Sequence, residues 1–201
     1  MDYIEYSQEI YENKYHAKWT WIDEIHVPAD LLANFATEEY YRARFHNWLM
    51  PFKLRGSLLE LGFNSGKTAY WFAQKYPDLT VDGIDFSRPL AKIADLIPRL
   101  APNLRNFVLG DFSELPFSNS TYQFISCLDV IEHLPEKKYA EMIDECHRVL
   151  VPGGLIFIHV GQFDCEWHIN RIPHEQVMID FALRGFRLHY AIPDFLVMSK
   201  V

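Results

Sequence analysis

A turn rich in glycine, with an acid before it and a helix after it, is the segment of this chain best suited to bind a small ligand. Residues 58–69 read Leu-Leu-Glu-Leu-Gly-Phe-Asn-Ser-Gly-Lys-Thr-Ala. Gly62, Asn64 and Gly66 allow positive φ angles and a close approach of a ligand to the backbone. A helix predicted over residues 67–75 would direct its N-terminal amides towards that ligand. The segment therefore predicts a cofactor-binding crossover from a buried strand to a helix.

Spacing argues against two other glycine motifs. A phosphate-binding P-loop has four residues between its first glycine and Gly-Lys-Thr, whereas Gly62 and Gly66 enclose three. A dinucleotide-binding turn has the pattern Gly-x-Gly-x-x-Gly, and here Asn64 holds the middle position and the last glycine comes one residue early. An enzyme that uses a nucleotide bound at residues 66–68 remains an alternative hypothesis for this chain. This hypothesis predicts binding of Mg²⁺-ATP.

An acid follows the second predicted strand. Residues 80–85 read as a strand that ends in Asp85, about twenty residues after the glycine turn. A carboxylate at this position can accept hydrogen bonds from ribose hydroxyls. Its alternative role is to cap the helix predicted over residues 89–100, although Ser87 is the more natural cap. Asp85 is therefore predicted to bind the ribose of a cofactor.

Residues 60–66 resemble motif I of the class I S-adenosylmethionine-dependent methyltransferases, in particular the small-molecule enzymes with a type 11 or type 12 core. That motif is acid-x-Gly-x-Gly-x-Gly, and here Asn64 replaces the central glycine. The run Arg-Val-Leu-Val-Pro-Gly-Gly at residues 148–154 is a second hallmark, and the resemblance covers about residues 57–160. It implies S-adenosylmethionine as cofactor and S-adenosylhomocysteine as product. It also implies that Asp111, after a strand predicted over residues 106–109, faces the adenine amino group. The residues predicted to bind the cofactor are Glu60, Gly62, Phe63, Asn64, Gly66, Asp85, Phe86, Asp111, Phe112, Leu128 and Asp129.

The reaction that this resemblance implies is an in-line displacement, in which a lone pair of the acceptor attacks the methyl group on the sulfonium. Positioning supplies most of the rate, and a base matters when the acceptor is a hydroxyl or a protonated amine. His133 is the candidate base, because residues 132–133 follow the fourth predicted strand, which ends at residues 127–130, where similar enzymes line the site of methyl transfer. Its alternative role is to shape that loop. His159, at the end of the fifth predicted strand, is expected either at the ligand-binding edge of the sheet or in the core.

The amino-terminal residues 1–50 lie outside the family pattern and are predicted to form a helical cap. Tyr11, Tyr15 and Trp19 recur every four residues and share one helical face, with His16 beside them. This face either covers the acceptor, as amino-terminal helices often do in the resembled family, or packs against the sheet without touching a ligand. A second helix is predicted over residues 37–49. The residues predicted to bind the acceptor are Tyr11, Tyr15, His16, His159, His168, Asn170 and Arg171, the last three from a stretch that similar enzymes use for this purpose.

Alternating strand and helix patterns predict the fold class α/β. The expected architecture is a Rossmann-like, doubly wound, mostly parallel seven-stranded sheet with helices on both faces and an antiparallel edge strand. Residues 51–201 would form the methyltransferase domain, in a single folding unit. The further predicted elements are a helix over 136–150, a strand over 155–160, a helix over 174–183 and strands over 187–191 and 195–199.

Composition predicts a compact soluble enzyme. The chain has 201 residues, of which 49% are apolar, so it can bury a substantial core. Its formal net charge of −8 and the lack of a basic block argue against nucleic acid as a partner. No segment is apolar enough to predict a membrane span or a signal peptide, and the three cysteines show no disulfide framework, so a cytoplasmic location is expected. No metal site is predicted, because His159, His168 and His174 match no metal-binding spacing.

Methyl transfer to a small-molecule acceptor is the predicted function, with oxygen or nitrogen as the methylated atom left open. A homodimer is left open as well. The alternative is a catalytically inactive Rossmann-like module that binds S-adenosylmethionine or S-adenosylhomocysteine and has a regulatory or interaction role. Asn64 in motif I is the support for that alternative.

Overall fold

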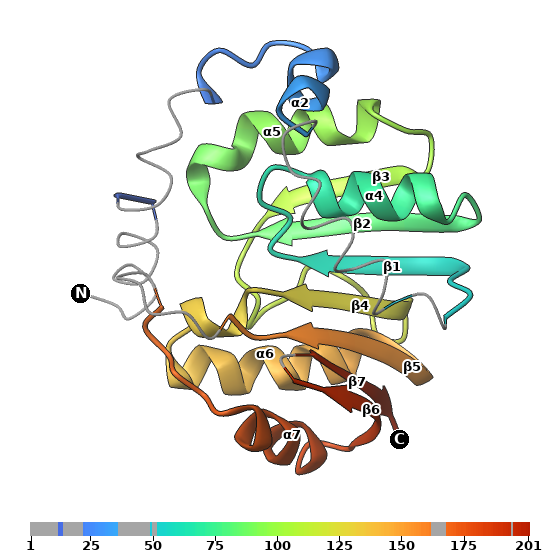
Figure 1. Cartoon of the computed structure of the whole chain (residues 1–201), viewed down its shortest axis with the longest axis vertical. Coiled ribbons are helices and arrows are strands. Elements are labelled where there is room, and N and C mark those ends of the chain that lie inside the picture. Colours follow the sequence, from blue (N-terminus) through green and yellow to red (C-terminus); the bar gives the residue numbers. More distant parts are fainter. Residues whose placement is uncertain (1–11, 14–21, 36–48, 50–51, 162–167, 194) are drawn as a thin grey trace.

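A computed structural model of the chain describes residues 12–13, 22–35, 49, 52–161, 168–193 and 195–201. A seven-stranded sheet runs through the middle of the described part, and helices cover both of its faces (Figure 1). The strand order is β3-β2-β1-β4-β5-β7-β6. The predicted α/β, Rossmann-like architecture is therefore confirmed.

The strands from β3 to β5 in this order pair in parallel, so their carboxyl ends meet at one edge of the sheet, which we call the carboxyl edge (left in Figure 1). β7 runs antiparallel to both β5 and β6, which confirms the predicted antiparallel pairing at the far end of the sheet. The strand bounds are β1 Gly56–Leu61, β2 Leu79–Asp85, β3 Leu104–Leu109, β4 Tyr122–Leu128, β5 Leu150–His159, β6 Phe186–Ile192 and β7 Phe195–Lys200.

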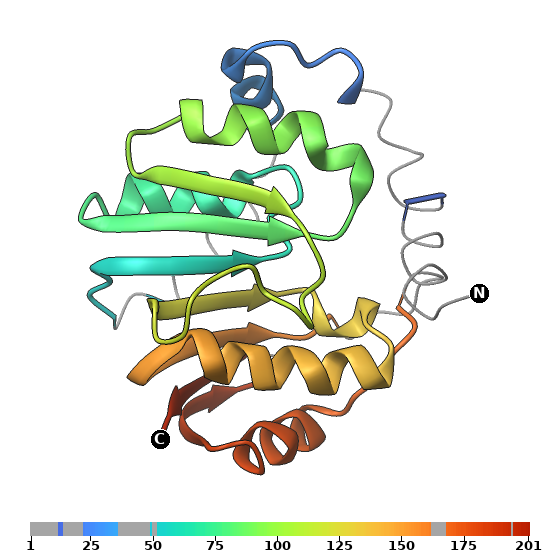
Figure 2. The ribbon, with the colours of Figure 1, turned by 180° about the vertical axis from the view of Figure 1, so that it is seen from behind.

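Two groups of helices enclose the sheet. One face packs against α4 and α5 with the more distant α2, and the opposite face packs against α6 and α7 (Figure 2). The bounds are α2 Pro28–Phe35, α4 Lys67–Lys75, α5 Ala91–Leu96, α6 Glu136–Val149 and α7 His174–Ala182, with short 3₁₀ helices η4 Arg88–Leu90, η5 Ile97–Arg99 and η6 Ile131–His133.

The core of each layer follows from the periodicity of the sequence. β1 is buried on both sides over residues 58–61, as expected of a parallel strand between two helical layers. On α6 the buried residues recur at intervals of three and four, which places them on one helical face against the sheet. The spacing predicts these buried residues, namely Tyr139, Met142, Ile143, Cys146 and Val149. It also predicts Leu150 on this face, but Leu150 begins β5.

Several element boundaries differ from the prediction by one or two residues, and two elements differ more. The helix predicted over residues 89–100 is divided into η4, α5 and η5, and Pro98 lies within η5, where it cannot donate an α-helical hydrogen bond. The strand predicted over residues 155–160 begins earlier, at Leu150, because β5 already pairs with β4 at Tyr122 before a shift in register. Residues 152–154 were expected to separate helix from strand, and they lie within β5 instead.

The amino-terminal region contains one helix that the sequence analysis did not predict. In α2, Pro28 occupies the first turn, where its missing N–H costs nothing. Asp30 accepts hydrogen bonds from the backbone N–H groups of His26 and Val27 at 2.8 and 2.9 Å. The predicted cap residues Tyr11, Tyr15 and His16, and most of the helix predicted over residues 37–49, lie outside the described residues.

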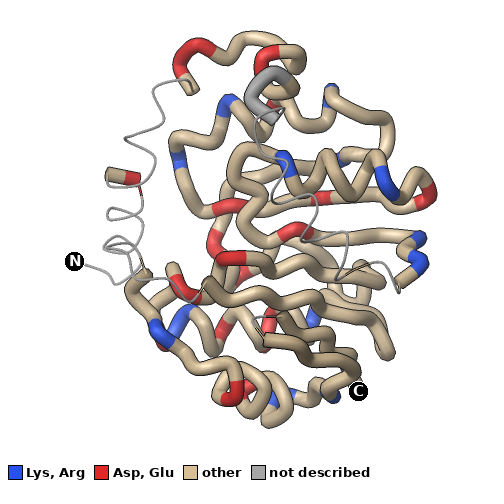
Figure 3. The backbone as a smooth tube through the Cα atoms, in the orientation of Figure 1, with Lys and Arg blue, Asp and Glu red and all other residues tan. Residues whose placement is uncertain are grey.

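Charge is distributed widely over the described part of the chain. Lys and Arg are scattered along the tube of Figure 3, and acidic residues occur among them at the carboxyl edge. None of the described helices is both long and apolar enough to cross a membrane.

Candidate functional site

The strand order reverses between β1 and β4, so the crossover connections leave their carboxyl ends in opposite directions. In open α/β sheets, ligands bind in the crevice that such a reversal creates. Most of the predicted cofactor residues follow the carboxyl ends of β1, β2, β3 or β4. The fold therefore brings segments that are far apart in sequence to one place.

The glycine turn after β1 has the backbone that its residues predict. Gly62, Asn64 and Gly66 have φ angles of 74°, 50° and 83°. A Cβ atom at Gly66 would lie 2.6 Å from a side-chain carbon of Ile97, and one at Gly62 would lie 2.8 Å from Val130. Asparagine tolerates a left-handed conformation better than most residues, so Asn64 preserves the shape of the turn in place of glycine.

Glu60 lies beneath the turn and is 3% exposed. Burial, and then the nearby carboxylate of Asp85, raise the pKa of Glu60 well above its ordinary value, while hydrogen bonds from the Thr68 side chain and the Ala69 backbone oppose this rise. Glu60 thus lies buried between β1 and the first turn of α4.

Asp85 ends β2 beside the glycine turn. Its carboxylate oxygens accept hydrogen bonds from the backbone N–H groups of Asn64 at 2.9 Å and Ser87 at 3.0 Å. The residue is 4% exposed, and burial raises its pKa to about 6 against the opposing effect of these N–H groups. Asp85 therefore joins two loops of the carboxyl edge, through Asn64 and Ser87.

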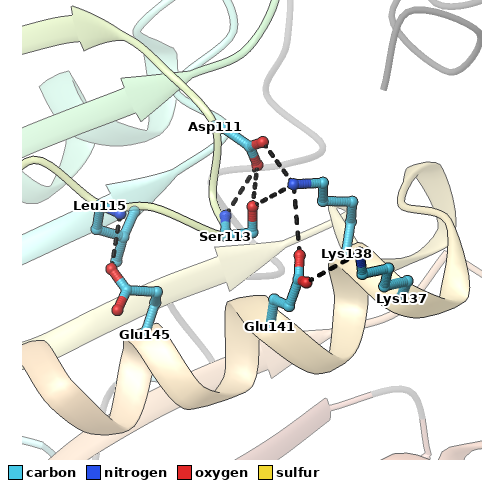
Figure 4. Close-up of polar contacts among 7 residues, drawn as sticks. All are labelled: Asp111, Ser113, Leu115, Lys137, Lys138, Glu141 and Glu145. Atoms are coloured by element: carbon cyan, nitrogen blue, oxygen red, sulfur yellow. Dashed lines mark hydrogen bonds and ion pairs between the residues drawn. The ribbon is translucent and has the colours of Figure 1, made fainter. Parts of the chain in front are cut away.

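Asp111 follows β3 and takes part in a polar network with α6 (Figure 4). It accepts hydrogen bonds from the backbone N–H and hydroxyl of Ser113 at 2.9 and 2.8 Å, and its other oxygen lies 2.9 Å from Lys138 Nζ. Burial alone would raise the pKa of Asp111, but Ser113 and Lys138 lower it below the ordinary value. Next to it, Phe112 is buried and packs edge to face on Phe86 at 5.6 Å.

Asp129 and His159 form a pair at the ends of two neighbouring strands. Asp129 has a φ angle of 56°, and its Oδ1 atom lies 2.5 Å from His159 Nδ1. The backbone N–H of Asp129 also donates to the His159 carbonyl at 3.0 Å. The Asp129 side chain is 31% exposed and that of His159 is 5% exposed, so the histidine supports the carboxylate from the protein side. The sequence predicts roles for both residues but does not predict their contact.

Known proteins resemble this chain in sequence and in fold. Residues 58–154 match the family model of a methyltransferase domain. A demethylmenaquinone methyltransferase of Chlamydia caviae is 32% identical over 117 residues, which are 56% of this chain and 49% of the relative. A solved structure described as a SAM-dependent methyltransferase from Methanosarcina mazei superposes with a TM-score of 0.62 at 18% identity, over 79% of this chain and 97% of that one. Together these matches support a methyltransferase domain of the class I S-adenosylmethionine-dependent type over residues 58–154.

The curated relatives are longer than this chain. A ubiquinone biosynthesis O-methyltransferase of Pseudomonas aeruginosa is 30% identical over 132 residues, which are 64% of this chain and 54% of the relative. The chain thus spans about half the length of the curated relatives it matches.

Glu132, His133 and His168 form a second group near Asp129. Their possible ligand atoms all lie within 4.8 Å of one another, and all three residues are buried. Glu132 Oε1 accepts a hydrogen bond from the Gly161 N–H at 2.7 Å. Burial, and then the charge of Asp129, raise the pKa of Glu132 to about 8. Roles for the two histidines are predicted from the sequence, but no role is predicted for Glu132, although this acid directly precedes His133.

Of the other residues predicted to bind the acceptor, Asn170 and Arg171 belong to the described part of the chain, and Tyr11, Tyr15 and His16 do not. The Asn170 backbone N–H donates to the Glu132 carbonyl at 3.1 Å, which holds this segment beside η6, whereas Arg171 is exposed. In the amino-terminal region, Glu12 accepts hydrogen bonds from the Arg88 backbone and side chain, the shortest at 2.8 Å. Glu12 therefore lies at the carboxyl edge. In the sequence it stands between Tyr11 and Tyr15, two predicted cap residues outside the described part of the chain.

Asp85→Ala is expected to weaken the binding of S-adenosylmethionine by about 1.5 to 3 kcal/mol, the range for a lost hydrogen bond to a charged group. The substitution also removes the acceptor for two loop N–H groups, so the glycine turn loses support. Calorimetric titration of both proteins measures the difference, with Asp95→Ala on the exposed side of α5 as a control. Unchanged affinity in the Asp85 variant would remove Asp85 from the ribose site.

Cofactor affinity is also expected to fall as the pH drops below about 6. Burial raises the pKa of free Asp85 to about 6, and hydroxyl donors favour the ionised carboxylate, so binding of the cofactor lowers that pKa. The affinity for the cofactor is then at its maximum well above pH 6, and it declines by up to about tenfold for each pH unit below 6. Titrations between pH 5 and 8 measure this, and Asp85→Asn should remove the decline. A decline of equal size in the Asp85→Asn protein would contradict the assignment.

Proposed function

We propose that the protein transfers the methyl group of S-adenosylmethionine to a small-molecule acceptor. The observation that carries the proposal is the joining of motif I to the end of β2, where Asp85 binds the Asn64 N–H beneath the positive-φ turn. The turn has no room for a Cβ atom at Gly62, beside Val130, or at Gly66, beside Ile97, so both positions of motif I require glycine. These features fit a cofactor that carries a ribose.

The chain's own residues chiefly position the reactants. When bound, the cofactor supplies a methyl group on a positively charged sulfur. Asp85 would accept hydrogen bonds from the ribose hydroxyls, and Asp111 is proposed to face the adenine. The turn over residues 62–66 and the carboxyl end of β4 would hold the methyl group in line with the acceptor, which supplies most of the rate enhancement.

We assign the base to the Asp129–His159 pair in preference to His133. Asp129 is the more exposed member of the pair, and its Oδ2 atom accepts no hydrogen bond from the residues that the structure describes. It can accept the proton of an acceptor hydroxyl or amine while His159 holds its other oxygen. The acceptor forms a bond to the methyl carbon, the carbon–sulfur bond breaks with its electrons left on sulfur, and the proton passes to Asp129. His133 packs against His168 in the buried group described above.

A small acceptor is favoured by the named activities of the curated relatives. One relative acts on demethylmenaquinone, and another is an O-methyltransferase of ubiquinone biosynthesis. A quinone or phenol ring with a hydroxyl group is the acceptor class to screen first. The alternative of an inactive module relied on Asn64, and Asn64 adopts the conformation that the motif requires.

Calorimetric titration with S-adenosylmethionine and S-adenosylhomocysteine, with ATP as a competing ligand, tests the cofactor assignment. We expect micromolar binding of the first two, followed by formation of S-adenosylhomocysteine when a panel of phenolic and amine acceptors is added. Binding of ATP alone would exclude S-adenosylmethionine as the cofactor of this chain. Binding of the cofactor without turnover of any acceptor would favour the inactive module.

A further inference from the structure

We propose that Glu132, His133 and His168 bind one divalent transition-metal ion. The three residues offer one carboxylate oxygen and two imidazole nitrogens, all within 4.8 Å of one another. Two tetrahedral ligands at about 2.0 to 2.2 Å from an ion lie less than 4 Å apart, so a small shift of side chains would complete the site. This proposal concerns ion binding and does not depend on the proposed methyl transfer.

The backbone places the three ligands from two separate segments. Glu132 and His133 are consecutive in η6, which follows β4, and His168 lies beyond the end of β5. The Asn170 N–H donates to the Glu132 carbonyl at 3.1 Å, so the segment that carries His168 is bonded directly to η6. The carboxylate and the two rings are thus held by hydrogen-bonded backbone near the carboxyl edge.

Gly161 orients the carboxylate of Glu132. Its N–H donates to Oε1 at 2.7 Å. A Cβ atom at Gly161 would collide with this same oxygen and lie 3.1 Å from the His168 ring. Gly161 therefore orients Glu132 through its N–H, and its lack of a side chain leaves room for the carboxylate and the His168 ring. Metal ligands are commonly oriented by such hydrogen bonds from neighbouring groups.

The environment of the other carboxylate oxygen of Glu132, Oε2, favours a bound cation. Glu132 is 1% exposed, and its Oε2 atom is buried with no hydrogen-bond partner among the residues that the structure describes. A buried carboxylate oxygen without a partner is costly, and such groups in native proteins are paired or coordinate metals. The two histidine rings meet edge to face beside it, with their centroids 5.0 Å apart. An ion bound between them would neutralise the acid.

The ligand set selects the kind of ion. Two imidazoles and one carboxylate suit Zn²⁺, Co²⁺ or Fe²⁺, whereas Mg²⁺ and Ca²⁺ prefer oxygen ligands throughout. Three protein ligands leave at least one coordination position for water or another oxygen. We therefore expect tight binding of Zn²⁺ and Co²⁺ and no comparable binding of Mg²⁺.

Titration of the chelator-treated protein with Co²⁺, without cofactor or acceptor, tests the proposal. We expect one Co²⁺ per chain, with visible absorption bands that disappear when Zn²⁺ is added. His168→Ala and the nearly isosteric Glu132→Gln should each weaken Co²⁺ binding by more than about 100-fold. His189→Ala, on the exposed strand β6, is the matched control and should bind Co²⁺ as the unsubstituted protein does.

The titration has clear contrary outcomes. Lack of Co²⁺ and Zn²⁺ binding by the unsubstituted protein would overturn the proposal, and so would unchanged binding in both His168→Ala and Glu132→Gln. Circular dichroism and thermal melting show which variants are folded, and if one ligand variant fails to fold, the other decides. Titration of the same metal-free protein with S-adenosylmethionine reports on the proposed function separately, so the failure of one proposal is distinguishable from failure of the other.

Discussion

Asp129→Asn is expected to lower turnover by about 10²- to 10⁴-fold, the usual contribution of a positioned base, and to change cofactor affinity by less than about threefold. The amide keeps the size of the carboxylate, and its oxygen can still accept a hydrogen bond from His159. It cannot take a proton from the acceptor. The expected loss therefore lies in the chemical step.

Formation of S-adenosylhomocysteine at saturating cofactor, with the best acceptor from the screen, measures this loss. Asp144→Asn is a matched control, because the Asp144 side chain is 67% exposed on α6 and pairs with Arg184. Turnover equal to that of the unsubstituted protein would exclude Asp129 as the base. A large loss of cofactor affinity with normal turnover at saturation would instead place Asp129 in the cofactor site, where the family resemblance puts it.

Arg148→Met is expected to lower the free energy of unfolding by about 2 to 3 kcal/mol, which is large for a residue outside the apolar core. The guanidinium binds both oxygens of Glu145 at 2.7 Å and donates to the carbonyls of Leu115 and Phe117 at 2.9 and 2.8 Å. It also donates to Asn119. Arg148 therefore fastens the loop between β3 and β4 to the last turn of α6, and methionine keeps its aliphatic stem but none of its donors.

Urea unfolding, followed by circular dichroism, measures the change. Arg184→Met provides the comparison, because Arg184 donates to the Asp180 carbonyl at 3.2 Å and pairs with the exposed Asp144. Exposed pairs of this kind contribute about 0 to 1 kcal/mol, so we expect a much smaller loss. Equal losses in the two variants would show that the bonds to the 115–119 loop contribute nothing beyond an ordinary surface contact. The Arg-Val-Leu-x-Pro-Gly-Gly hallmark would then lack this structural explanation.

Local patterns predicted most of the fold correctly. The buried face of α6 follows from side chains three and four residues apart, and the turn at Gly62 to Gly66 follows from residues that tolerate positive φ. The ends of helices and strands were predicted less well where the pairing of two strands determines them. β5 begins at Leu150 because β4 offers a partner there, and no pattern within residues 150–154 reveals that partner.

By itself, the sequence determined the class of fold, the motif I turn, and the acids that end β2 and β3, because each depends on residues within a few positions of one another. Only the tertiary structure decided which of these residues meet. Asp129 and His159 are thirty residues apart and touch because β4 and β5 are parallel neighbours, and Glu12 reaches Arg88 across 76 residues. The contact of Glu132 and His133 with His168 likewise depends on where the chain returns after β5. Such contacts follow from the order and register of whole strands, which no spacing along the chain encodes.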